Sequence, residues 1–288
     1  MAVLLSVLSA LCFGAAAVTS RIGLRSLDAR AGAAISVPTA TVLFLIVSPF
    51  TLDIAGFVLL AALLFALVGL FFPALVTIVT FKSNQRLGPT VTSAVSGTAP
   101  LFALAAASLC LGERIPAQAV VAAAGVVAGV WLLSWNPRAV RPGFAGWALL
   151  LPLSGALLRG IAQVIAKAGL LLWPNPFAAS LLGYCVSSAV VISADRLSRS
   201  RTRIKTNSAT RRGILWFGVT GVLNGGAVLL MYVALSMAPV STVAPVVASF
   251  PLVTALLSSL VLREERVTLR AMAGALVTVS AIVYMVAA

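Results

Sequence analysis

The sequence predicts an all-α integral membrane protein, with ten transmembrane helices in two inverted repeats of five. Three observations predict this fold class: the apolar composition, the placement of the cations, and a duplication that relates the two halves of the chain. Hydrophobic residues make up 61% of the 288 positions and charged residues only 9%, and the mean hydropathy is +1.13. A soluble domain of this length cannot bury so much apolar surface, whereas a bilayer can.

Apolar runs of about 20 residues, the length that crosses a bilayer, follow one another along the chain with short polar breaks between them. The third run is long and is interrupted at Pro73, which a span tolerates where neighbouring groups satisfy the freed carbonyl. The seventh run is short. We expect helices at residues 3–20, 31–50, 54–81, 89–111, 116–135, 145–170, 177–193, 214–237, 239–262 and 268–287.

Lysine and arginine are distributed unevenly between the connections of these helices. Odd-numbered connections hold 17 of the 20 cations, whereas even-numbered connections hold Arg114, with Lys167 at the edge of one. By the positive-inside rule, the odd-numbered connections lie in the cytoplasm and both termini lie outside the plasma membrane. The most basic segment, 194–213, is interpreted as a solvated cytoplasmic loop, with contact to acidic lipid headgroups or nucleic acid as the lesser alternative.

The two halves of the chain are related by a duplication. Residues 153–170 align with residues 7–24 at an offset of 146, with seven of the eighteen positions identical. We place the first repeat at 1–136, a linker at about 137–144 and the second repeat at 145–288. Because each repeat has an odd number of helices, the second must enter the membrane in the opposite sense, an architecture of many secondary transporters. Matched pairs include Gly14 with Gly160, Gly23 with Gly169, Arg21 with Lys167, and Pro100 with Pro251.

Three features of the chain match a known pattern: an early Phe13-Gly14 pair, a Leu-Gly-Glu-Arg turn at 111–114 with an echo at 262–266, and proline-led fourth and ninth helices. In these features the chain resembles, over essentially its whole length, the EamA-type family of the drug/metabolite transporter superfamily. The resemblance implies a central cavity between the repeats, alternating access, and transport, often export, of amino acids, metabolites or drugs. The chain departs from the pattern where Arg159 replaces the aromatic residue of the first repeat and where Arg263 replaces Gly112.

Arg159 is the leading candidate for substrate recognition. It lies about 21 Å along a helix that begins at Ala145, at 1.5 Å per residue, and therefore inside the apolar core. An arginine there costs roughly 2.5–3.5 kcal/mol, so it should face protein or a water-filled cavity. Gln163 and Lys167 follow at helical spacing on the same face. We expect Arg159 to bind a carboxylate or phosphate and Gln163 to hydrogen-bond the same ligand. The alternative is a structural role for Arg159, while Lys167 is expected to reach the membrane surface.

Other polar and aromatic groups within the spans are weaker candidates for substrate contact, because hydroxyls in such helices usually bond to their own backbone or to a neighbour. Asn224 and Tyr232 lie two turns apart on one side of their helix. Asn224 precedes Gly225-Gly226, where we expect the helix to open and expose backbone groups. The glycine pairs 125/129 and 221/225 have the small-xxx-small spacing of close helix packing. The remaining candidates are Phe13, Ser96 and Tyr184.

Several classes of function are disfavoured by the residue inventory. The chain contains no histidine, its three cysteines are dispersed in apolar runs, and all six carboxylates lie in or beside connections. We therefore expect no metal or other cofactor and no catalytic constellation. Within the superfamily, exchange of protons for cationic drugs uses an intramembrane glutamate, which has no counterpart here.

The sequence thus predicts a secondary transporter, and by resemblance an exporter, of a small organic metabolite such as an amino acid, an organic anion or a drug-like solute. A flippase for a lipid-linked phosphate headgroup is the alternative, and a membrane-embedded enzyme or a scaffold is less favoured. The expected partners are a small-molecule substrate and membrane lipid, and not nucleic acid. The oligomeric state is not predicted.

Overall fold

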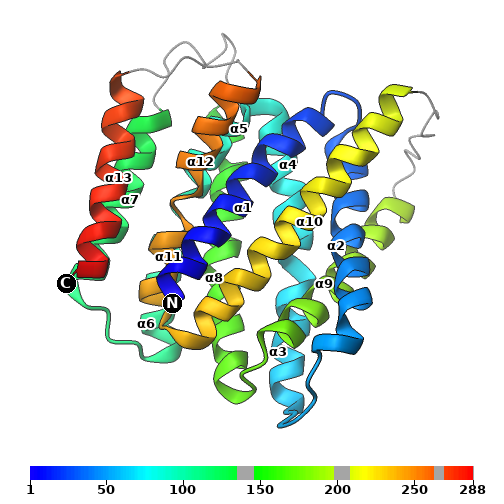
Figure 1. Ribbon diagram of the computed structural model, residues 1–288, viewed down its shortest axis with the longest axis horizontal. Coiled ribbons are helices and arrows are strands. Elements are labelled where there is room, and N and C mark those ends of the chain that lie inside the picture. The colour runs from blue at the N-terminus through cyan, green and yellow to red at the C-terminus, as the bar shows by residue number, and fades with distance from the viewer. Residues whose placement is uncertain (135–145, 198–207, 263–268, 288) are drawn as a thin grey trace.

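The structure is a computed structural model that describes residues 1–134, 146–197, 208–262 and 269–287. All its regular elements in these ranges are helical, so the predicted all-α class is confirmed (Figure 1). The elements are α1 (Ala2–Gly23), α2 (Ala29–Thr51), α3 (Leu59–Phe71), α4 (Ala74–Leu87), α5 (Pro89–Ser96), α6 (Ala99–Leu111), α7 (Ala117–Ser134), the short 3₁₀ helix η1 (Gly146–Leu149), α8 (Leu150–Leu172), α9 (Pro176–Leu197), α10 (Ser208–Met237), α11 (Val240–Val247), α12 (Phe250–Leu257), the π-helical turn η2 (Ser258–Leu262) and α13 (Leu269–Ala287).

Within the described residues, eight helical segments are long and apolar enough to cross a membrane, and α7 and α13 contain shorter apolar stretches. The chain is therefore a multi-pass membrane protein. Most predicted helices coincide with these segments to within a few residues. The clearest difference is the third, which begins at Leu59 rather than at 54 and extends through Leu87 rather than ending at 81. The linker at 137–144 lies outside the described residues.

The break between α3 and α4, at Pro73, is bridged by a side chain of α9. The Ser187 hydroxyl donates a hydrogen bond to the Gly69 carbonyl and accepts one of 3.2 Å from the Ala74 N–H. Both backbone groups lie next to the proline, where the regular helical pattern is interrupted. A neighbouring helix therefore satisfies the freed groups, as expected for a proline inside a span.

The other two interrupted spans, α5–α6 and α11–α12, are broken in the same way. The α5–α6 break is closed by Thr98, whose hydroxyl donates to the Val95 carbonyl at 2.7 Å. In the α11–α12 break Ser249 donates to the Val246 carbonyl at the same distance. In both cases a proline follows in the first turn of the second helix, where its missing N–H costs no hydrogen bond.

Matched glycines make the same contact in each half of the chain. Gly14 of α1 lies against the start of α12, and a Cβ added to it would stand 2.9 Å from the Phe250 carbonyl oxygen. Gly160 of α8 lies against the start of α6, where an added Cβ would stand 2.9 Å from the Ala99 carbonyl oxygen. Glycine is needed at both positions because backbone atoms occupy the adjacent space, together with the β-branched Val253 side chain at Gly14.

The helices α1 and α8, which carry the aligned segments, run in opposite directions. The end of α1 lies beside the last turn of α4, where Arg21 Nη1 donates to the Asn84 carbonyl at 3.2 Å. The start of the η1–α8 segment lies beside the same turn, because the Arg86 guanidinium stands 4.8 Å from the centroid of the Trp147 ring. The C-terminus of α1 and the N-terminus of α8 are therefore at one end of the molecule.

That end carries most of the described cations and is at the top of Figure 1, where α10 and α13 also begin. Its cations are Arg21, Arg25, Arg30, Lys82, Arg86, Arg211, Arg212 and Arg270. By contrast, α1 begins and α13 ends away from it, in the lower half of the same view. The remaining cations of 135–145, 198–207 and 263–268, including Arg263 and the echo of the Leu-Gly-Glu-Arg turn, lie outside the described residues.

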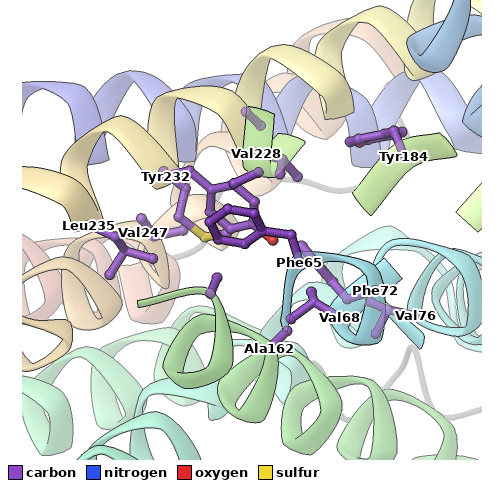
Figure 2. Packing of buried hydrophobic residues seen from close by; sticks show 14 of the residues in the cluster. Phe65, Val68, Phe72, Val76, Ala162, Tyr184, Val228, Tyr232, Leu235 and Val247 are labelled. Atoms are coloured by element: carbon purple, nitrogen blue, oxygen red, sulfur yellow. The ribbon is translucent and has the colours of Figure 1, made fainter. Parts of the chain in front are cut away.

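The hydrophobic core lies where helices of both halves meet. Figure 2 shows part of its largest cluster, in which Phe65 and Val68 of α3 approach Ala162 of α8 and Tyr232 of α10. The contact is close because Gly169 of α8 lies against the Phe65 ring. Small residues on the interior faces thus let aromatic side chains fill the space between helices.

Candidate functional site

Arg159 is buried at the centre of the molecule, with 8% of its surface exposed. Its guanidinium stands over two aromatic rings, 4.9 Å from the centroid of Phe13 on α1 and 5.3 Å from that of Phe250 on α12. These distances are within the range of cation–π attraction. Phe13 and Arg159 are aligned positions at which a charge in the second repeat replaces an aromatic residue in the first, and these two residues contact each other.

The guanidinium nevertheless has unsatisfied hydrogen-bonding capacity. Nε and Nη1 of Arg159 are buried and have no hydrogen-bond partner among the described residues. Removing a cation from water costs several kcal/mol, and cation–π contact returns about 2 kcal/mol when desolvated. Two buried guanidinium nitrogens without partners in this setting favour an anion that accepts hydrogen bonds, namely a carboxylate or a phosphate.

A cavity adjoins Arg159 on the side of the basic end. Its volume is about 30 Å³, and since a water needs roughly 10–15 Å³, this conformation holds two or three waters rather than an organic solute. The walls come from α1, α4, α5, α8, α10 and α12, so both halves of the chain contribute. Its polar lining consists of Ser20, Thr80, Asn84, Thr92, Ser93, Ser96, Arg159 and Asn224.

Asn84 of α4 supplies a fixed acceptor to this cavity. Its Nδ2 donates to the Ala17 carbonyl at 3.1 Å and to the Ser20 hydroxyl at 2.9 Å. This network assigns the amide orientation and leaves Oδ1 buried with no partner among the described residues. The cavity therefore has an unused cationic donor at Arg159 and an unused neutral acceptor at Asn84.

Sequence reasoning did not identify Asn84, because the third helix was expected to end at 81 and the residue fell in a connection. The helix extends for a further turn and a half, to Leu87. The sequence offered no signal that singles it out, because Asn84 is one of three uncharged polar residues between Lys82 and Arg86.

The structure brings together four of the seven predicted residues and places three elsewhere. Phe13, Ser96, Arg159 and Asn224 line the cavity. Gln163 is buried one turn from Arg159, with its Oε1 unpartnered among the described residues, but it does not line the cavity. Tyr184 and Tyr232 belong to the hydrophobic cluster.

Two of these three residues bury a polar atom outside the cavity. The Tyr184 hydroxyl, like Gln163 Oε1, has no hydrogen-bond partner among the described residues. Polar atoms buried without partners are rare in folded proteins. The unpartnered atoms of Gln163 and Tyr184 therefore mark a region that a conformational change could open to a ligand.

The expected opening of α10 after Asn224 is wrong, because the helix is continuous from Ser208 to Met237. Gly221 and Gly225 instead allow α2 to pack closely, the first against the Ser36 carbonyl and the second against Ala40. The same holds for Gly125 and Gly129, which lie against α13. The small-xxx-small spacing thus reports helix packing.

Lys167 is partly exposed and contacts the end of a neighbouring helix. Its Nζ donates to the carbonyls of Leu235, at 2.7 Å, and Ala238, at 3.1 Å, where α10 ends. Opposite it, the Glu113 carboxylate accepts hydrogen bonds from the first two N–H groups of α11, those of Val240 at 3.1 Å and Ser241 at 3.3 Å. Each charge faces the helix end of opposite partial charge. The pair therefore stabilises the α10–α11 turn, which lies at the end of the molecule opposite the basic end.

The fold and the cavity define a multi-pass helical membrane protein whose halves share a packing pattern and enclose a polar site with a buried arginine. The model of the EamA-like transporter family matches residues 1–135 and again 146–287, and the chain belongs to this family. A crystal structure described as that of a "protein" shares the fold, with a TM-score of 0.75 and 14% identity over 98% of this chain and 95% of the other. No curated protein matches the sequence.

Proposed function

We propose that the chain is a secondary transporter that moves a small organic anion or zwitterion by alternating access, with Arg159 as the anion-binding group. Family membership supports transport, and the buried guanidinium with two unpartnered nitrogens carries the choice of substrate class. Export is the direction that the resemblance to the EamA-type family implies. Among the described residues, the one charged group that lines the cavity is Arg159, which repels a cation.

The proposed architecture is ten transmembrane helices in two inverted five-helix repeats. The opposite directions of α1 and α8, the matched contacts of Gly14 and Gly160, and the paired breaks at Thr98 and Ser249 support this arrangement. Repeats of this kind place the substrate between the halves and alternate by rocking of one half against the other. Arg159 lies at this boundary, against Phe13 of the first repeat.

The substrate site is expected to form in two parts. Arg159 binds the carboxylate or phosphate through its planar donors, and the Asn84 amide oxygen accepts a hydrogen bond from an N–H or O–H elsewhere on the solute. Gln163, Tyr184 and Tyr232 are added when the cavity widens. A ligand with an anion and a nearby donor therefore satisfies groups that are otherwise left unpaired, and desolvated unpaired groups are costly.

A stability screen organised by ligand charge tests this proposal. We expect small carboxylates and organic phosphates that also carry a donor to raise the unfolding free energy of the purified protein, by about 2.7 kcal/mol at 100 times Kd. Cations of the same size should produce no shift. A set of stabilising ligands made only of cations would overturn the assignment of an anionic substrate.

We further propose that the basic end is cytoplasmic and that both termini lie outside, in the plasma membrane, because positively charged connections are retained in the cytoplasm. A phosphatase reporter that is active only outside the cytoplasm should be active when fused after Ala288. The same reporter inserted between 198 and 207 should be inactive. Reversed activities would contradict this orientation.

A further inference from the structure

A second, wholly different depression lies on the outside of the helix that carries Arg159. It is a groove of about 520 Å³ between α3, α6 and α8. Its lining contains only apolar side chains and Cys110. Leu109 is 86% exposed and Leu157 41% exposed, so the groove opens to the outer surface. It shares no lining residue with the cavity at Arg159.

The groove uses the face of α8 that is opposite the polar one. Leu157, Ile161 and Ile165 line it at four-residue spacing. They precede Arg159, Gln163 and Lys167 by two positions each, which is about half a turn of an α-helix. One helix therefore presents buried polar side chains to the interior and a hollow apolar wall to the surroundings.

The helices that border the groove have counterparts in the other half of the chain. In the proposed repeat α1 corresponds to α8, and the third span of the second half, α10, corresponds to α3–α4. Figure 1 shows α1 lying along α10, and the contact is close because the Phe217 ring of α10 meets Gly23 of α1. The Phe65 ring of α3 meets the matched Gly169 of α8 in the same way, and the groove lies beside this contact, on the side of α6.

Water is a poor occupant of such a groove, since cavities without polar partners stay dry. The surrounding helices cross the membrane, so acyl chains are the apolar material at hand. One end of the groove is formed by Cys110 and Leu111, and Arg114 follows within three residues. Arg114 is exposed and has no hydrogen bond or ion pair among the described residues, so it is placed to meet a negatively charged headgroup.

We propose that this groove binds one acyl chain of an anionic membrane phospholipid, with the phosphate near Arg114. The lipid is a bound component and not the transported solute, because the groove and the cavity lie on opposite faces of α8. A second copy of the chain is the competing occupant.

Photo-cross-linking of the full-length protein tests the site. The protein is reconstituted in phosphatidylcholine vesicles that contain a small fraction of phosphatidylglycerol with a diazirine on one acyl chain. We expect cross-links to concentrate in residues 102–111 and 157–168. Ala105→Trp or Leu109→Trp, at exposed groove positions, should reduce them at least fivefold, whereas Ala124→Trp, at an exposed position of α7, should not. Cross-links spread evenly over the membrane-facing helices, or unchanged in both groove variants, would overturn the proposal.

Two further arms distinguish the lipid from its alternatives. Arg114→Gln should reduce by several fold the preference for labelled phosphatidylglycerol over equally labelled phosphatidylcholine, and an unchanged preference would overturn the anionic assignment. Native mass spectrometry should show a wild-type monomer that retains one phospholipid. A wild-type dimer that becomes monomeric in Ala105→Trp would assign the groove to a second copy. None of these measurements depends on transport.

Discussion

Arg159→Gln should abolish most of the stabilisation by anionic ligands while leaving the empty protein as stable as the wild type, or more so. The ligand loses charge-assisted hydrogen bonds worth about 1.5–3 kcal/mol, which is roughly a 10- to 100-fold increase in Kd. The empty protein loses an uncompensated buried cation, and replacing such a charge is often neutral or favourable. Thermal unfolding with and without ligand measures both effects.

The expected effects of Arg159→Gln on ligand-induced stabilisation and on the stability of the empty protein differ in sign, and this difference separates a binding role from a structural one. If Arg159 only supported the fold, the substitution would lower the stability of the empty protein and leave the ligand-induced shift intact. Arg159→Lys keeps the charge but loses the planar fork, so its ligand affinity should be intermediate. Arg211→Gln removes an exposed cation at the basic end and serves as the control, for which we expect an unchanged shift.

Gly160→Val should destabilise the protein by about 1–3 kcal/mol or more, the cost of overpacking a closely packed interior. A Cβ at this position would lie 2.8 Å from the Ala103 backbone nitrogen and 2.9 Å from both the Ala99 carbonyl oxygen and Phe102 Cβ. Two of these atoms are backbone, so relief requires α6 and α8 to move apart. The measurement is the denaturant or thermal unfolding midpoint of the purified variant.

Gly226→Val provides a matched control on α10, because nothing lies within 4 Å of a Cβ added there. Its stability should stay within about 1 kcal/mol of the wild type, since the change in helix propensity is small. Gly14→Val should behave as Gly160→Val does, given the equivalent contact with α12. Equal stability of the Gly160 and Gly226 variants would contradict the close α6–α8 packing.

Much of the fold could be predicted from the sequence because helices that cross a membrane are long apolar segments, which are easily recognised. Long apolar runs predicted the helices, and the aligned segments predicted the correspondence of α1 with α8. The mismatch of Phe13 and Arg159 also led to the cavity, because a charge inside an apolar helix has few physical explanations.

The remaining features of the site depend on which helices pack against each other, and the sequence pattern does not determine that packing. Asn84 is buried because α4 extends beyond the apolar run and packs against α1. Lys167 donates to the carbonyls at the end of α10, and Glu113 caps α11 across a separation of 127 residues. Gly225 adjoins Ala40 of α2, so its small size serves packing rather than an opening of the helix.

Counterflow into proteoliposomes most directly tests transport of an anionic solute through the Arg159 site. The vesicles are loaded with an excess of the anion that stabilises the protein most, and labelled anion is added outside. We predict that wild-type protein transiently accumulates the label, and that Arg159→Gln stays at the level of protein-free vesicles while Arg211→Gln behaves as the wild type. Wild-type counterflow no greater than that of protein-free vesicles, or undiminished counterflow in Arg159→Gln, would contradict the account.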